Sequence, residues 1–290
     1  MKNTSKSLRL PPAERCGIIA FALAILLGAV DLHLATVPLT LLVMLCVIAP
    51  FLPRSGFFFP VVSRGTTGKD RVAITFDDGP DPATTPHLLD LLEKYRVPAA
   101  FFVTGRRAAV YPHLVRAIID RGHEVGNHTF HHNKYRMFWQ PGLLDHEIVA
   151  TQRALAPLGI VPLAFRPPIG ITTPAMGKVL AARNLFAVNF SCRAFDAGNR
   201  RIGRLSRKIL TAVQPDDIVL LHDSTPDTGR SIEPWFEEVE AILEGLSEKG
   251  LTATPLSRLI DRPVMRRKDD TTFLVSDDRV CRSQDSAATT

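Results

Sequence analysis

Short apolar segments of strand-like composition alternate with amphipathic, helix-like segments between residues 71 and 255. The expected strands are 72–76, 99–103, 124–126, 163–166, 185–190, 218–222 and 252–255, and the expected helices are 85–95, 112–121, 143–155, 174–183, 205–213 and 232–248. This repetition favours an α/β fold with a parallel sheet or barrel, because parallel strands need a crossover connection. In such folds the functional groups gather at the carboxyl ends of the strands.

Two adjacent carboxylates, Asp77 and Asp78, follow the first expected strand of this region. At a strand end they point in different directions, so one can bind a metal while the other accepts a proton from water. His128 and His132 are four residues apart, and on a helical turn both imidazoles would share one face. With Asp78 they predict a two-histidine, one-carboxylate metal centre with coordination positions left open. For Asp77 and Asp78 the alternative is an acidic turn that caps the next helix. For His128 and His132 the alternative is a solvated polar turn.

Three further polar residues also lie where expected strands run out into loops. Arg166 beside Asp77 would keep that carboxylate ionised. His222 ends the apolar segment 218–221 and, if Asp196 orients it, is suited to protonate a leaving amine near neutral pH. The ordered set of motifs therefore predicts a hydrolase with one metal ion.

The same motifs resemble those of the NodB-like polysaccharide deacetylases, carbohydrate esterase family 4, over about 190 of the 290 residues. They are TFDDG at 75–79, HTFHH at 128–132, FRPPIG at 165–170, the single Asp196, and LLHD at 220–223. The resemblance implies an irregular (β/α) barrel with fewer than eight regular strands. It also implies that Asp78, His128 and His132 bind one divalent metal ion, with zinc as the default for this donor set.

The resemblance assigns catalytic roles to four residues. Asp77 corresponds to the catalytic base and His222 to the catalytic acid. Arg166 corresponds to the residue that orients or tunes the base, and Asp196 to the partner of the acid.

Substrate contacts are implied at two positions, with the backbone near Ile169 helping to hold the oxyanion and Leu220 lining the acetyl pocket. The chain departs from the family in having Ile169 where an aromatic residue is common. It also has Ala197 where a tryptophan follows the aspartate of the fourth motif. Both departures predict a differently shaped sugar-facing groove.

The implied activity is hydrolysis of the N-acetyl group of an amino sugar in a polysaccharide, an oligosaccharide or a lipid-linked glycan. An alternative keeps the chemistry and changes the substrate to an N-formyl sugar or another amide. A third interpretation is an inactive carbohydrate-binding or assembly protein. The intact set of predicted acidic and imidazole groups argues against it.

Residues 16–53 are apolar apart from an interruption at 31–33. A hydrocarbon core of roughly 30 Å needs about 20 helical residues, so one straight span cannot use the whole stretch. We expect a pair of transmembrane helices forming a hairpin, and the alternative is one span with the remainder lying in the interface.

Basic residues flank both ends of this apolar stretch. They are Lys2, Lys6, Arg9 and Arg15 before it and Arg54, Arg64, Lys69 and Arg71 after it. The positive-inside rule therefore predicts an anchor in a bacterial-type inner (cytoplasmic) membrane, with residues 1–15 and the catalytic domain on the cytoplasmic side.

The remaining chain divides into a linker at 54–70, the deacetylase domain at 71–262 and a disordered tail at 263–290. In the linker, Phe57–Phe59 are expected at the lipid interface.

The formal net charge is +6, but the positive residues are dispersed and no nucleic-acid motif is present, so nucleic acid is not expected as a partner. One basic cluster, 200–208, is either a solvated helix face or a contact for anionic headgroups or the phosphate of a lipid-linked sugar. The sequence gives no indication of oligomeric state.

Overall fold

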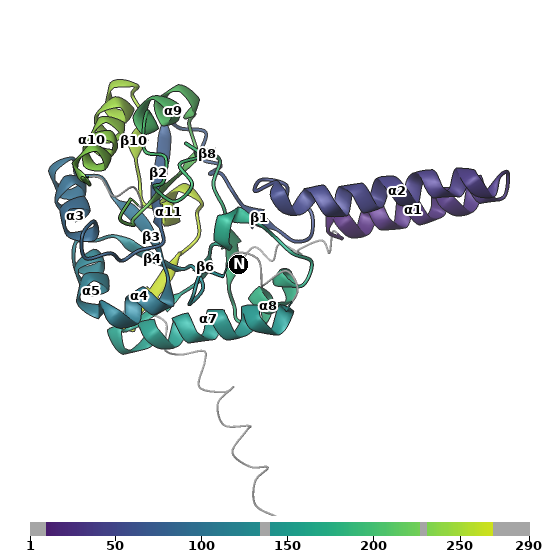
Figure 1. The fold of residues 1–290 in the computed structure, drawn as a ribbon, viewed down its shortest axis with the longest axis horizontal. Coiled ribbons are helices and arrows are strands. Elements are labelled where there is room, and N and C mark those ends of the chain that lie inside the picture. The colour runs from purple at the N-terminus through teal and green to yellow at the C-terminus, as the bar shows by residue number, and fades with distance from the viewer. Residues whose placement is uncertain (1–9, 134–139, 227–230, 269–290) are drawn as a thin grey trace, which may run out of the picture.

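A curled, almost entirely parallel sheet forms the centre of the computed structural model, which describes residues 10–133, 140–226 and 231–268 (Figure 1). Its strand order is β1-β7-β6-β4-β3-β2-β9-β8, and β10 also pairs with β2. These strands are β1 (Val61–Val62), β2 (Arg71–Asp77), β3 (Ala99–Val103), β4 (Glu124–Asn127), β6 (Ala164–Phe165), β7 (Phe186–Val188), β8 (Cys192–Arg193), β9 (Ile218–His222) and β10 (Thr252–Ala253). The irregular (β/α) barrel is thereby confirmed.

Helices cover the outer face of this sheet (Figure 1). They are α3 (Thr85–Lys94), α4 (Gly105–Val110), α5 (Pro112–Asp120), α7 (Pro141–Leu155), α8 (Met176–Ala182), α9 (Leu205–Ala212) and α10 (Glu233–Glu248). The short helix α11 (Leu256–Leu259) instead lies on the inner side, where Leu256 and Leu259 pack in the same core as Ala73. The chain also forms 3₁₀ turns η2 (Ala156–Leu158) and η3 (Pro168–Gly170). A separate two-stranded pair joins β5 (Ile160–Pro162) to β11 (Met265–Arg267) in antiparallel register.

Strand β2 explains how the fold positions the site, because its two faces are both buried. Ile74 and Phe76 belong to the large apolar core beneath the helices, where Phe76 stacks on Phe101 at 5.2 Å between ring centroids. Ala73, which precedes them and points to the opposite face, belongs to a second core on the inner side of the curled sheet. Since side chains alternate along a strand, Asp77 also points to the inner side. Parallel neighbours then bring their own terminal residues to the same edge.

Every helix and strand expected from the alternating pattern is present, with boundaries shifted by at most a few residues. Two of the domain boundaries are wrong. Residues 54–70 are not a free linker, because β1 pairs with β7, and Phe57 and Phe59 are buried rather than exposed to lipid. The tail expected from residue 263 begins as the ordered strand β11, while residues 269–290 lie outside the described part of the chain.

Helices α1 (Pro12–Gly28) and α2 (Leu32–Ile48) run antiparallel and project from the domain as a hairpin (Figure 1). The turn lies at 29–31, slightly earlier than the expected 31–33, because Asp31 caps α2 by accepting a hydrogen bond from the His33 N–H at 2.8 Å. With the 3₁₀ turn η1 (Ala49–Phe51), the stretch Leu32–Phe51 is the single candidate membrane span among the described residues, by length and composition. The expectation of two transmembrane helices is thereby reduced to one candidate span, because α1 has only 17 residues.

Candidate active site

The two carboxylates at the end of β2 separate as the sequence predicts. The side chain of Asp77 is buried and its Oδ1 accepts a hydrogen bond from the Arg166 guanidinium at 2.7 Å. Asp78 adopts a left-handed backbone conformation, with φ at 74°, which short polar side chains tolerate better than most. This turn directs the Asp78 carboxylate towards His128 and His132 instead of towards Arg166. The pair can therefore serve two different functions.

Asp78, His128 and His132 form a compact donor set whose ligand atoms all lie within 4.8 Å of one another. Asp78 Oδ1 lies 3.3 Å from His132 Nε2 and 3.7 Å from His128 Nε2. His128 Nδ1 lies 2.7 Å from the Arg166 carbonyl oxygen and must donate to it, because a carbonyl only accepts. This leaves the Nε2 lone pair of His128 facing Asp78. Two imidazoles and one carboxylate fit a divalent cation such as Zn²⁺ and leave coordination positions open.

The two histidines meet through a loop, so the expectation of a helical turn is wrong. Thr129 and His132 both have positive φ angles, of 64° and 56°. The Thr129 N–H donates to Asn127 Oδ1, and the His132 N–H donates to Thr129 Oγ1. Burial lowers the pKa of His128 to about 3, which keeps its imidazole in the neutral form that binds metals.

Arg166 is completely buried and forms the floor beneath Asp77. Its Nη1 donates to Asp77 Oδ1 and to Thr75 Oγ1, both at 2.7 Å, and its guanidinium lies 3.9 Å from the centre of the Phe102 ring. Burial raises the pKa of Asp77, and the positive charge of Arg166 opposes that rise. The expected contact is therefore observed. Its effect is to offset a desolvation penalty rather than simply to lower an ordinary pKa.

His222 and Asp196 face each other across the loop that follows β8, with Nδ1 of His222 2.7 Å from Oδ2 of Asp196. Burial disfavours the imidazolium, but the hydrogen bond and the charge of Asp196, with smaller contributions from the charges of Asp78 and Asp77, outweigh it and raise the pKa of His222 to about 9. The imidazole is consequently protonated at neutral pH and can act as an acid through Nε2.

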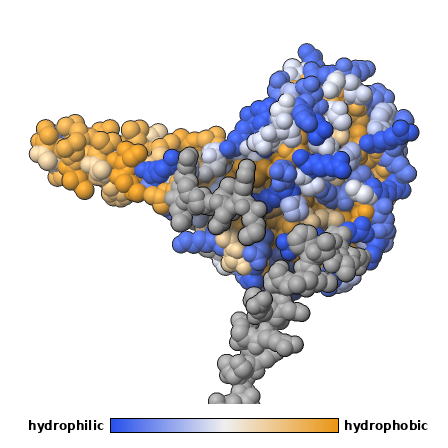
Figure 2. Space-filling model, turned by 180° about the vertical axis from the view of Figure 1, so that it is seen from behind, coloured by the Kyte–Doolittle hydropathy of each residue, from blue (hydrophilic) through white to orange (hydrophobic). Residues whose placement is uncertain are grey.

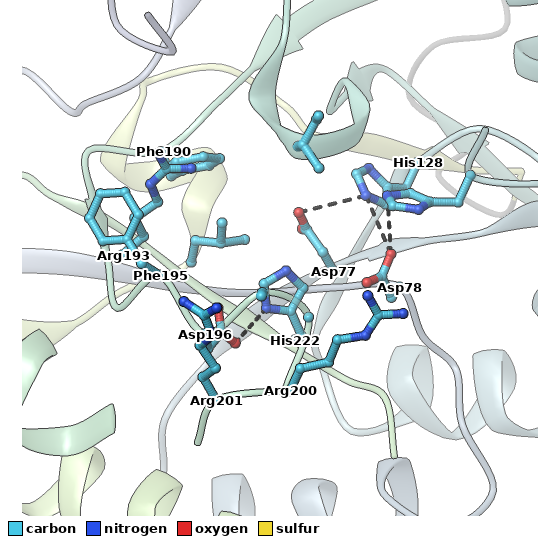
Figure 3. Close-up of a pocket in the computed structure, with 15 residues that line it drawn as sticks. Asp77, Asp78, His128, Phe190, Arg193, Phe195, Asp196, Arg200, Arg201 and His222 are labelled. Atoms are coloured by element: carbon cyan, nitrogen blue, oxygen red, sulfur yellow. Dashed lines mark hydrogen bonds and ion pairs between the residues drawn. The ribbon is translucent and has the colours of Figure 1, made fainter. Parts of the chain in front are cut away.

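One pocket collects nearly all of the predicted residues (Figure 3). Its lining comprises Asp77, Asp78, His128, His132, Ile169, Phe190, Arg193, Phe195, Asp196, Ala197, Gly198, Arg200, Arg201, Leu220 and His222. Arg166 lies below this surface, against Asp77. Ile169 is 37% exposed at the rim in a left-handed conformation, and Leu220 is buried in the wall. The structure thus brings the predicted set together, while the catalytic roles stay predictions.

Two buried residues that support the site are not among those predicted from the sequence. Asn199 donates through Nδ2 to the carbonyl oxygens of His222 at 2.9 Å and Ser224 at 2.7 Å, and its Oδ1 accepts from Trp235 Nε1 at 3.1 Å. It therefore fastens the loop of Asp196 to the end of β9. A lone asparagine in a loop predicts none of this.

Asp223 is the second missed residue, although it follows His222 directly. It is fully buried and accepts hydrogen bonds from the hydroxyl groups of Thr84 and Thr85, both at 2.6 Å. Burial raises its pKa to about 7. Its position inside the LLHD motif is the signal that could have identified it.

The carboxyl-end pocket, with a donor set for one cation and a carboxylate and an imidazole on neighbouring strands, defines a hydrolase of the (β/α)-barrel type. The family described as polysaccharide deacetylase matches residues 64–187 of the chain. A chitooligosaccharide deacetylase of Bradyrhizobium sp. is 34% identical over 202 residues, covering 67% of this chain and 92% of that protein. A peptidoglycan-N-acetylglucosamine deacetylase of Bacillus cereus is 33% identical over 191 residues, covering 65% and 87%.

Solved structures give the same result. The crystal structure of the Bc1960 peptidoglycan N-acetylglucosamine deacetylase superposes with a TM-score of 0.64 at 29% identity, covering 71% of this chain and 95% of that chain. The chain belongs to the polysaccharide deacetylase family, whose members are hydrolases of carbon–nitrogen bonds other than peptide bonds.

Proposed function

We propose that the protein is a metal-dependent N-deacetylase that removes the acetyl group from an amino sugar of a glycan. The observation that carries the proposal is the placement of Asp77 and His222 as register partners on β2 and β9, next to the donor set of Asp78, His128 and His132. The two relatives named above are deacetylases of N-acetylated glycans, which supports an amino-sugar substrate.

A divalent ion held by Asp78, His128 and His132, with zinc as our first choice, would polarise the acetyl carbonyl and lower the pKa of water. Asp77 accepts the proton of the attacking water, and the buried Arg166 orients its carboxylate. His222 donates the proton from Nε2 to the leaving nitrogen, because Asp196 holds its Nδ1–H. The acetyl methyl group packs against the buried Leu220, and the backbone near Ile169 lies at the rim beside the developing oxyanion.

Release of acetate is the direct test of this proposal. We expect the purified, zinc-loaded protein to release acetate from N-acetylglucosamine oligomers, and formate release from matched N-formyl sugars distinguishes the deformylase alternative. Absence of both products from a fully metal-loaded protein would contradict the proposed chemistry.

We also propose that the hairpin anchors the enzyme in a bacterial inner membrane. Within α1 and α2 only Ala20, Ala24 and Pro38 are buried, so apolar side chains face outwards around the hairpin (Figure 2). An apolar surface this extensive is costly in water and is typical of contact with lipid. Both ends of the hairpin lie at the catalytic domain, which together with the basic flanks supports a domain on the cytoplasmic side.

A further inference from the structure

Three arginines line the active-site pocket and have no part in the proposed acetyl hydrolysis. They are Arg193 at the end of β8 and Arg200 and Arg201 in the loop before α9. Figure 3 shows the side chain of Arg201 beside Asp196, and that of Arg200 extending past His222 towards Asp78. A guanidinium matches the geometry of phosphate oxygens through paired N–H donors. A neutral sugar polymer offers no anionic group for such a set.

Arg193 also lies where the domain meets the base of the hairpin. A second, mainly apolar groove is lined by Leu52, Pro53 and Arg54 from the segment that follows α2. It shares Phe190, Arg193 and Phe195 with the active-site pocket, so these three residues form a common wall. The two hollows are therefore neighbours on a path from the hairpin to the metal-ligand set.

Specific contacts fix the base of the hairpin to this wall. Asn189 Nδ2 donates to the Pro53 carbonyl at 2.9 Å and to the Gly170 carbonyl at 3.1 Å. The Arg54 guanidinium donates to the Ser191 carbonyl oxygen. The main-chain carbonyl oxygen of Asn189 in turn accepts a hydrogen bond from Arg166 Nη2 at 3.2 Å. The groove consequently keeps a defined place relative to the catalytic carboxylate.

Phe195 makes the wall unusual, because its aromatic side chain is 67% exposed and lies under the Arg193 guanidinium at 4.1 Å. Its backbone is left-handed, with φ at 57°, a conformation that is unfavourable for a residue with a large side chain. An exposed aromatic ring beside an arginine offers an apolar surface and a cationic group at one point.

We propose that the natural substrate is an N-acylated amino sugar carried on the phosphate ester of a lipid. Arg193, Arg200 and Arg201 bind the phosphate while the sugar amide enters the pocket. The lipid chain crosses Phe195 into the groove at Leu52 and Pro53 and continues along the hairpin into the bilayer. This inference rests on the proposed deacetylase function and adds the substrate class.

Four synthetic substrates that share one N-acetylglucosamine unit test the inference with the detergent-solubilised full chain. They are the methyl glycoside, the 1-phosphate, the methyl phosphodiester and the farnesyl phosphodiester, each assayed by acetate release. We expect kcat/KM for the methyl phosphodiester to exceed that for the methyl glycoside by about tenfold to a hundredfold, the contribution of one or two charge-assisted hydrogen bonds. We expect the farnesyl phosphodiester to exceed the methyl phosphodiester by a further tenfold or more, through burial of the chain.

Variants separate the two parts of the site. Arg201→Gln should reduce the preference for phosphodiester over methyl glycoside about tenfold. Phe195→Ser should reduce the preference for farnesyl over methyl phosphodiester. Arg207→Gln is the matched control, because Arg207 is exposed on α9 and does not line the pocket, so both preferences should stay at wild-type values.

Each outcome assigns a failure to one proposal. Equal efficiency on the methyl glycoside and both phosphodiesters, with Arg201→Gln reducing all of them in parallel, would overturn the phosphate site and leave the deacetylase function standing. Equal efficiency on the 1-phosphate, methyl and farnesyl substrates would overturn the lipid carrier and point to a soluble sugar phosphate. No acetate from any of the four would overturn the proposed deacetylase function, and the inference with it.

Discussion

Asp77 and His222 are register partners on the neighbouring parallel strands β2 and β9, and each is the last residue of its strand. Residues paired in this way point to the same face of a sheet. A proton acceptor and a proton donor therefore flank one point at the edge of the barrel. Each is held from behind by an opposite charge, Arg166 for Asp77 and Asp196 for His222.

Replacement of Asp196 should move the alkaline limit of activity. His222 must be protonated to act as an acid, and in the wild type its pKa of about 9 keeps it so through neutral pH. In Asp196→Asn the largest raising influences on the pKa of His222 are lost and only the smaller ones of Asp78 and Asp77 still oppose burial, so the decline of kcat should begin at a lower pH than about 9. The pH profile of kcat measures this shift. An unchanged alkaline limb would show that Asp196 does not control the acid.

Loss of one imidazole should affect metal affinity before it affects chemistry. His128→Ala removes a buried donor whose orientation is fixed by the Arg166 carbonyl, and we expect zinc affinity to fall at least a hundredfold. Titration of the metal-free protein by calorimetry gives the affinity, and excess zinc should restore part of the activity. His131→Ala serves as the control, because that imidazole pairs with Glu147 instead of the donor set. Equal zinc affinity in the wild type and His128→Ala would remove His128 from the site.

Asp223 should make the folded state less stable as pH rises towards neutrality. Its pKa is about 7 in the folded protein and near 3.8 when unfolded, so between these values the folded state binds more protons. The stability that protonation provides is complete below about pH 4 and is lost as pH rises to about 7. Asp223→Asn keeps a neutral acceptor for the threonine hydroxyls and should be more stable than the wild type at pH 7.5 but not at pH 4.5.

Urea unfolding of both proteins at the two pH values measures that difference, which the shift in pKa limits to a few kcal/mol, on the order of 1.4 kcal/mol per unit. A wild type that is as stable as Asp223→Asn at pH 7.5 would indicate an Asp223 that ionises freely.

The anchor predicts a particular sidedness of the enzyme. Protease added to sealed inside-out vesicles should digest the catalytic domain, whereas right-side-out vesicles should protect it. Replacing Lys2, Lys6, Arg9 and Arg15 by glutamine weakens the basic N-terminal flank and should reduce the fraction of chains in this orientation. Protection in inside-out vesicles would place the domain on the opposite side of the membrane.

Strands β2 and β9 were predictable because each carries a buried apolar run that ends in a polar motif. The segments that escaped prediction are short. β1 has two residues and β11 three, too few for a periodic pattern, and tertiary pairing with β7 and β5 holds them in place. These contacts explain why the linker and the start of the tail are ordered.

In the candidate site, too, some features could be predicted from the sequence and others could not. Charged and imidazole residues in fixed motifs could be identified, whereas the helical turn expected for His128 and His132 is a loop with positive φ angles. The supporting role of Asn199 depends on carbonyl groups of β9 and on a tryptophan 36 residues away, which no local pattern reveals.

The most direct test of the account compares Asp77→Asn with Asp78→Asn. In the proposed mechanism Asp77 accepts a proton and lies outside the donor set, so Asp77→Asn should bind zinc with wild-type affinity and lose at least a hundredfold in kcat. Asp78→Asn should lose zinc affinity instead. Metal content and acetate release measured on the same preparations decide the matter. Full zinc occupancy together with wild-type turnover in Asp77→Asn would contradict the assignment of Asp77 as the base.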